Sequence, residues 1–174
     1  MKKNYIAFEH LCKRSILLCL FPLCFSAYGQ QKAIDSTFNI LRKHMKEDSV
    51  RVNALIYLSY LYQTSNLKNS EYYAREALQM SNKVNNELIT CASLSQLGSV
   101  YTWERKTTEA LSTYFRQHEI ALKINAGYWL QKAYIGIGYV YEMENEWGKA
   151  LSYTLQALHY AEISSNPSDK ASVY

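Results

Sequence analysis

The stretch CASLSQLGSVYTWERKTTEAL, residues 91–111, returns further along the chain as QKAYIGIGYVYEMENEWGKAL, residues 131–151. Aligned without a gap, the two stretches share identical or similar side chains at Leu97/Ile137, Gly98/Gly138, Val100/Val140, Tyr101/Tyr141, Ala110/Ala150 and Leu111/Leu151. A fixed period of about 20 to 50 residues is typical of stacked helical units. Such arrays mostly bind partners along an extended surface. The repeat therefore predicts a binding protein and leaves its ligand open.

Residues 1–29 have the features of a secretory signal peptide. Basic side chains precede an apolar run over residues 15–25, and Ala27 and Gly29 supply the small residues that a signal peptidase requires. This run is too short for a membrane-spanning helix, which needs about 20 residues. We therefore expect export to the periplasm or another extracytoplasmic space. The alternative is an uncleaved membrane anchor.

Removal of this leader changes the bulk composition. Residues 1–29 hold four of the 19 Lys and Arg residues and one of the 15 Asp and Glu residues, so a net charge of +1 remains. No basic patch then argues for nucleic acid. Cys91 is the one cysteine left, which excludes an internal disulfide. Because it falls on an apolar stripe with no histidine nearby, it is expected to be a buried packing residue.

Apolar residues recur at helical spacing through the rest of the chain, which contains one proline and five glycines. Strand-and-turn folds need more such residues, so an all-α chain is expected. The predicted helices cover residues 35–47, 50–64, 70–83, 87–104, 107–125, 129–144 and 146–164, and an eighth begins at Asn166-Pro167. Gly127 is the predicted cap after the fifth helix.

Small residues recur where paired helices would cross. Glycine inside a helix costs about 1 kcal/mol relative to alanine, so two glycines at equivalent positions suggest a close helix contact. A weaker unit before Gly98 places Ser59 at the glycine position. The predicted packing residues of the three units are Ser59, Gly98, Gly138, Tyr62, Tyr101, Tyr141, Ala110 and Ala150.

These positions resemble tetratricopeptide repeats (TPRs). That family has leucine-glycine, then a tyrosine and later an alanine at fixed offsets, a pattern matched by Leu97, Gly98, Tyr101 and Ala110 and by Ile137, Gly138, Tyr141 and Ala150. The common unit has about 34 residues. The spacing from Ser59 to Gly98 and from Gly98 to Gly138 is longer, which resembles the long-helix members. The resemblance implies a right-handed α-solenoid of antiparallel helix pairs.

A narrower resemblance concerns the order of the segments. A leader, a first helix, the segment 48–52 and long repeats are together similar to the extracytoplasmic N-terminal input region of Bacteroidetes-type signalling proteins. That resemblance implies a transmembrane helix and a kinase or DNA-binding output after the repeats, and neither lies within these 174 residues. The expected organisation is a signal peptide over 1–29 and a repeat domain over 30–174, with repeats over 48–86, 87–126 and 127–166 and the start of a truncated repeat over 167–174. A short capping helix is the alternative for the last segment.

In TPR proteins the first helix of each pair lines a concave groove. The resemblance therefore implies a groove for a protein or peptide, formed by Asn53, Tyr60, Gln63, Ser95, Ser99, Thr102, Trp103, Lys132, Tyr139 and Glu142, with Ile56, Ile135 and Met143 beside them. Mixed polar and aromatic side chains suit an extended peptide or a partner helix. A merely solvated surface is the alternative. Family members that bind acidic chaperone tails use a basic clamp, of which only Lys132 is present.

Enzymatic signals are weak. His44, His118 and His159 are isolated, and no pair has a metal-ligand spacing. No phosphate-binding glycine loop and no catalytic triad is apparent, so no cofactor, no metal and no catalytic residue is predicted. The leading hypothesis is a non-catalytic protein-binding module, serving as the sensory or scaffold part of a membrane-associated bacterial signalling protein. A free-standing periplasmic adaptor and an unrecognised enzyme are the alternatives. Membrane contact is expected only through the leader or a missing C-terminal part.

Overall fold

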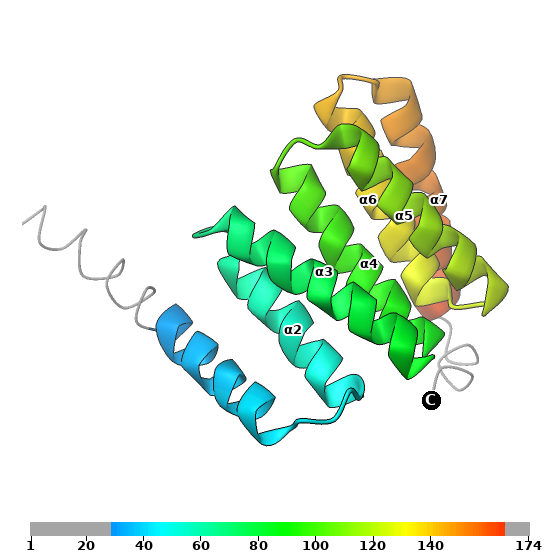
Figure 1. Cartoon of the computed structure of the whole chain (residues 1–174). Coiled ribbons are helices and arrows are strands. Elements are labelled where there is room, and N and C mark those ends of the chain that lie inside the picture. The colour runs from blue at the N-terminus through cyan, green and yellow to red at the C-terminus, as the bar shows by residue number, and fades with distance from the viewer. Residues whose placement is uncertain (1–28, 166–174) are drawn as a thin grey trace, which may run out of the picture.

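The computed structural model describes residues 29–165, and in this range the chain is helical with short turns (Figure 1). A helix over residues 29–43 is followed by α2 (Ser49–Tyr62), α3 (Leu67–Val84), α4 (Glu87–Trp103), α5 (Thr107–Lys123), α6 (Gly127–Met143) and α7 (Trp147–Ser165). The all-α expectation is confirmed. The predicted leader, apart from Gly29, and the predicted eighth helix lie outside the described residues. Within the described range, the first helix begins before position 35, where the periodicity placed its start.

The helices form a TPR-like superhelix of antiparallel neighbours arranged in two layers. α2, α4 and α6 contact one another in succession, whereas α3, α5 and α7 contact only helices adjacent in the chain. The even-numbered helices therefore form the inner layer and the odd-numbered ones the outer layer. In Figure 1 the chain proceeds from the helix over 29–43 at one end of the array to α7 at the other.

Polar side chains begin three of the helices. The side chain of Asp48 accepts a hydrogen bond from the backbone N–H of Arg51 (3.1 Å) at the start of α2. Asn66 caps α3 and Asn86 caps α4 in the same way. Each cap satisfies backbone donors that a helix start leaves unpaired, and each is worth about 1 kcal/mol. These short polar turns separate helices of similar length and set the period of the repeat.

Arg51 joins the N-terminal helix to the repeats. Its guanidinium donates hydrogen bonds to the carbonyl oxygens of Leu41 (2.8 Å) and His44 (2.9 Å). These carbonyls lie at the end of the helix over 29–43, where acceptors are otherwise unpaired and a cation is favoured. Phe38 adds an edge-on contact to Tyr73 of α3. The first helix is thus an integral part of the array.

One tyrosine lies against glycines from two inner helices. The ring of Tyr114 on α5 is buried. A Cβ atom placed on Gly98 of α4 would lie 2.7 Å from its Cε1, and one on Gly136 of α6 would lie still closer to the same atom. Both positions are far inside van der Waals contact, so only glycine fits at either place while the ring stays where it is. The central core cluster, with Leu97, Ile137 and their neighbours, surrounds this contact.

Gly138 of α6 makes a close contact of the same kind with α7, its partner in the next helix pair. An added Cβ would lie 3.2 Å from Thr154 Oγ1 and 3.4 Å from the carbonyl oxygen of Ala150. Thr154 occupies the place in its repeat that Tyr114 occupies in the repeat before. The close approach therefore recurs in this pair, with a small side chain in place of the ring.

The outer face of α7 carries an uncovered apolar stripe. Trp147, Leu151, Leu155 and Leu158 are each 54–61% exposed and follow one another at helical spacing. At the corresponding face of α5, Leu111 packs into the central core and Phe115 contacts Tyr153 of α7. The stripe on α7 thus corresponds to a face that, on α5, is partly covered by the following helix pair, since Leu111 is half-buried and Phe115 is 37% exposed.

Alanine substitution at Gly98 or Gly136 should destabilise the fold by about 1 to 3 kcal/mol, because the added methyl group overpacks the Tyr114 ring. Gly148 on α7 is the matched control, since nothing lies within 4 Å of its added Cβ. Gly148→Ala should instead be neutral or stabilise by up to about 1 kcal/mol through helix propensity. Urea unfolding followed by circular dichroism measures the free energy of unfolding of the three variants. Equal changes at Gly98, Gly136 and Gly148 would contradict the close contact with Tyr114.

Candidate functional site

The inner helices expose aromatic side chains along the concave face. Tyr57 and Tyr60 of α2 are exposed, and their rings are nearly parallel with centroids 6.4 Å apart. Trp103 of α4 is 56% exposed and Tyr139 of α6 is 54% exposed. Large exposed aromatic groups are typical anchors for a binding partner. They make this face the candidate site.

Two of these aromatic groups border one hollow between α4 and α6. Thr102, Trp103, Arg105, Tyr139 and Met143 line this aromatic hollow, which has a volume of about 180 Å³. Three of the predicted groove residues, Thr102, Trp103 and Tyr139, are therefore brought together. Arg105 is a further lining residue, which the sequence did not single out.

Three predicted groove residues are held by the protein itself. Gln63 is buried and donates a hydrogen bond from its side chain to Ser99 Oγ at 2.6 Å. Thr102 is also buried, and its hydroxyl donates to the carbonyl oxygen of Gly98 at 2.8 Å. A second link between α2 and α4 runs from Gln96 Nε2 to Ser59 Oγ at 3.0 Å. The side chains of Gln63, Ser99 and Thr102 are therefore engaged in hydrogen bonds within the protein, and of the three only Thr102 lines a hollow.

The remaining predicted groove residues are spread over the face. Asn53 lines a second hollow of about 480 Å³ between the helix over 29–43 and α2. Lys132 is exposed, and its ammonium group lies 5.5 Å from the centroid of the Tyr128 ring. Ser95 is half-buried and Glu142 is exposed, and neither lines one of the hollows described here.

Tyr57 is a lining residue that the sequence did not single out. It borders the second hollow together with Asn53. Its position on the exposed side of α2, next to Tyr60 one helical turn further on, is the signal that could have identified it.

The predicted packing residues lie toward the interior. The buried members of the set are Ser59, Gly98, Gly138, Tyr101, Ala110 and Ala150, whereas Tyr62 and Tyr141 are half-buried. The two half-buried rings stack on tyrosines of the outer helices, Tyr62 on Tyr73 with centroids 5.7 Å apart and Tyr141 on Tyr153 at 5.5 Å. Gly136, which was not predicted as a packing residue, has the closest contact of the described glycines.

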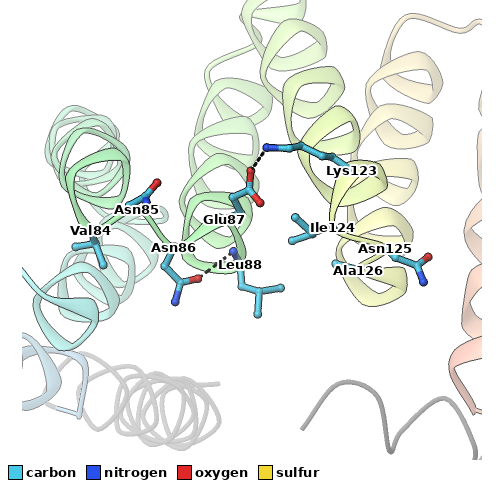
Figure 2. A pocket seen from close by; sticks show the side chains of 9 residues that line it. All are labelled: Val84, Asn85, Asn86, Glu87, Leu88, Lys123, Ile124, Asn125 and Ala126. Carbon is cyan, nitrogen blue, oxygen red and sulfur yellow. Dashed lines mark hydrogen bonds and ion pairs between the residues drawn. The ribbon is translucent and has the colours of Figure 1, made fainter.

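The largest of the three hollows lies at the edge of the array, between two helix connections (Figure 2). Residues 84–88 and 123–126 line its volume of about 780 Å³. Across it, Lys123 Nζ lies 2.6 Å from Glu87 Oε1, and the side chain of Asn86 accepts a hydrogen bond from the N–H of Leu88. Lys83 and Glu47 form the same pair one repeat earlier, also at 2.6 Å. This recurrence at the repeat interval indicates that the exposed ion pairs belong to the stacking of the repeats.

Successive helix ends have a left-handed backbone at regularly spaced positions. Asn85, Arg105, Asn125 and Asn145 have φ values of 53° to 61°. Gly127 was expected to cap the fifth helix, and this expectation is wrong, because Asn125 takes the left-handed conformation and Gly127 begins α6. Asparagine tolerates the left-handed region because its short polar side chain bonds locally, whereas arginine has no such advantage. Arg105 therefore keeps a strained backbone at the edge of the aromatic hollow.

Lys106, the neighbour of Arg105 in the chain, is paired with two acidic side chains. Lys106 Nζ lies 2.8 Å from Glu104 Oε2 and 3.0 Å from Glu71 Oε2. Hydrogen bonds to Glu104 and then Glu71 raise the pKa of Lys106 to about 12. Burial alone would raise the pKa of Glu71, but the hydrogen bonds from Arg75 and Lys106 outweigh it and hold this pKa below its usual value. Both carboxylates are thus paired with other cations.

Cys91 is confirmed as a buried packing residue. It has no exposed surface, and its Sγ lies 3.9 Å from the carbonyl oxygen of Gln117. Burial raises the pKa of its thiol to about 11, so at neutral pH it is a neutral thiol and a poor nucleophile. Within residues 29–165, no group of three or more His, Cys, Asp or Glu side chains is arranged to hold a metal ion.

The arrangement on the inner face suits non-covalent binding. Its exposed groups include aromatic rings, the guanidinium of Arg105, the ammonium of Lys132 and the carboxylate of Glu142, on rigid helices and their ends. Such groups hold an extended chain through stacking, apolar contact and ion pairing. None of the described helices combines the length and apolar character needed to cross a membrane.

Comparison with known proteins finds a similar fold but no similar sequence family. The sequence matches no protein-family model and no curated protein. BtubC (BKLC) from P. vanneervenii superimposes with a TM-score of 0.61 at 13% identity, covering 82% of this chain and 57% of that one. The chain therefore spans somewhat more than half the length of BtubC. MamA matches over 80% of this chain and 93% of its own at 17% identity, with a TM-score of 0.36 that is too low to support an argument. The comparison with BtubC supports the fold alone.

Substitution of Arg105 by asparagine should stabilise the protein by about 0.5 to 1 kcal/mol, because asparagine adopts the left-handed conformation at lower cost. Asn125→Arg is the matched reverse change and should destabilise by a similar amount. Thermal unfolding of both variants measures the effect. A gain from both substitutions, or from neither, would contradict the strain assigned to position 105.

Proposed function

We propose that this chain is a non-catalytic repeat module whose inner-helix face binds a protein or an extended peptide. The observation that carries the proposal is the pair Trp103 and Tyr139, which are more than half exposed on neighbouring inner helices and border one hollow. Large apolar groups gathered on a surface are characteristic of sites that a partner covers. Both anchors project from regular helices, so little backbone order is lost on binding.

The wider role is proposed from the leader and the apolar stripe on α7. Residues 1–29 predict export, and the narrower resemblance implies the sensory or scaffold part of a membrane-associated bacterial signalling protein. The stripe from Trp147 to Leu158 supports a larger assembly because its counterpart on α5 is less exposed and partly covered by the following helix pair. A free-standing periplasmic adaptor is the second candidate. A coding sequence that continues into a hydrophobic segment of about 20 residues would favour the first of these.

Binding to the inner face is tested with selected peptides. A display library of random extended peptides is selected against the purified protein, and the affinities of the enriched peptides are measured. Replacing the three anchors Tyr60, Trp103 and Tyr139 by serine should weaken binding by about tenfold or more, as expected for aromatic hot spots.

The matched control replaces exposed apolar side chains of the outer layer. Tyr72 of α3 and Leu122 of α5 are each 57% exposed, so their change to serine should alter stability little. This variant should bind the selected peptides as tightly as the original protein. If the library yields no binder, or if the outer-layer variant loses binding equally, the proposed function is wrong.

Export is tested with the full chain carrying a C-terminal tag in a bacterium with two membranes. Osmotic shock should release the protein, and mass spectrometry should find a mature N-terminus at Gln30, because a signal peptidase cleaves after small residues. Replacing Ala27 by a bulky residue should block cleavage and leave the protein on the membrane. A protein that stays in the cytoplasm with residues 1–29 attached would contradict export.

A further inference from the structure

The aromatic hollow combines apolar walls with one positive charge. Its walls come from Trp103 of α4 and from Tyr139 and Met143 of α6, and Arg105 lies just after the end of α4. At about 30 Å³ per water molecule, a volume of 180 Å³ corresponds to about six waters. That is space for one aliphatic or aromatic side chain.

Arg105 forms no ion pair with an acidic side chain among residues 29–165. Its side chain is exposed, and its backbone N–H donates to the carbonyl oxygen of Thr102. Glu104 is held by Lys106, and the carboxylate of Glu144 accepts a hydrogen bond from Thr107 at 2.7 Å. A guanidinium at the border of an apolar hollow is well suited to a carboxylate, which it binds through two parallel hydrogen bonds.

From these observations we propose that the aromatic hollow recognises an acidic peptide, inserting one apolar side chain between Trp103 and Tyr139 while Arg105 pairs with a neighbouring side-chain carboxylate. The inference rests on the proposed function and specifies its ligand. A side-chain carboxylate is preferred over a chain terminus because the exposed aromatic face continues to Tyr57 and Tyr60 of α2. A partner that uses the whole face has chain on both sides of the hollow.

Arg105 also has a geometric reason to be retained. Its left-handed backbone would be satisfied better by asparagine, the residue found at the three equivalent helix ends. A strained residue next to a hollow, with its charge unpaired within the described residues, is a candidate for a role in binding. The assignment makes Arg105 the determinant of charge preference and Trp103 with Tyr139 the determinants of apolar contact.

The test uses Trp103 as a reporter. The chain has three tryptophans, so Trp129→Phe and Trp147→Phe leave Trp103 as the single one. The probe is a blocked peptide, acetyl-Gly-Ser-Leu-Glu-Ser-Gly-amide, compared with its Leu-Gln counterpart and with acetyl-Gly-Ser-Leu bearing a free carboxylate. The Leu-Glu peptide should shift the Trp103 fluorescence, and the Leu-Gln peptide should bind about tenfold more weakly, as expected for loss of one charge-assisted pair.

The same titrations are then made with charge variants. Arg105→Gln should abolish the preference for the Leu-Glu peptide, because it removes the guanidinium with little change in backbone preference. Arg116→Gln is the matched control, since Arg116 is an exposed arginine of the outer helix α5, and it should leave the preference intact. Added salt should weaken the Leu-Glu peptide more than the Leu-Gln peptide.

Several outcomes would overturn the inference. Equal binding of the Leu-Glu and Leu-Gln peptides would show that Arg105 does not select a carboxylate. The proposed function would still stand if library-selected peptides bind to the inner face. Binding of the free-carboxylate peptide alone would show that the hollow recognises a chain terminus. Absence of any Trp103 response, together with library peptides that bind elsewhere on the inner face, would place the ligand outside the hollow.

Discussion

The contact of the Tyr114 ring with two glycines is the constraint on which the array depends. The ring projects from the outer helix α5 against Gly98 of α4 and Gly136 of α6, and so joins one helix pair to the next. A Cβ at either glycine would lie well inside the contact distance of the ring. Burial raises the pKa of the Tyr114 hydroxyl, and a hydrogen bond with Thr102 lowers it in part. Thr102, which lines the aromatic hollow, is thereby linked to the buried Tyr114 ring.

This constraint connects packing to the binding face. Because the Tyr114 ring lies against both Gly98 of α4 and Gly136 of α6, it holds these two helices beside each other, and Trp103 and Tyr139 border one hollow between them. The hydrogen bonds from Gln63 to Ser99 and from Gln96 to Ser59 link α2 to α4 in a comparable way. Small and polar side chains at the inner layer thus let the aromatic groups point outward. The aromatic hollow is a consequence of how the repeats stack.

Part of the fold and of the candidate site could be predicted from the amino-acid sequence. The repeat of Gly98 and Gly138 and the burial of Cys91 follow from patterns along the chain, since the apolar periodicity of a helix extends over a few residues. Gly136 was missed because its partner ring belongs to the preceding helix and lies outside the aligned stretches. Nothing in the sequence indicated that Arg105 lines the aromatic hollow. The regular spacing of the asparagines at helix ends could have marked position 105 as another such end, but not as the edge of a hollow.

That this protein is a helical array follows from the amino-acid sequence, because helical periodicity and a long internal repeat are properties that can be read along the chain. Which polar residues of the inner helices are exposed follows instead from the packing of the helices. Gln63 and Thr102 have the same polar character as exposed residues of the inner helices, yet both are buried. Gln63 donates to Ser99 of the next inner helix, and Thr102 donates to the carbonyl oxygen of Gly98 one turn earlier in its own helix. Burial depends on neighbours that are distant in the chain, and no local pattern contains that information.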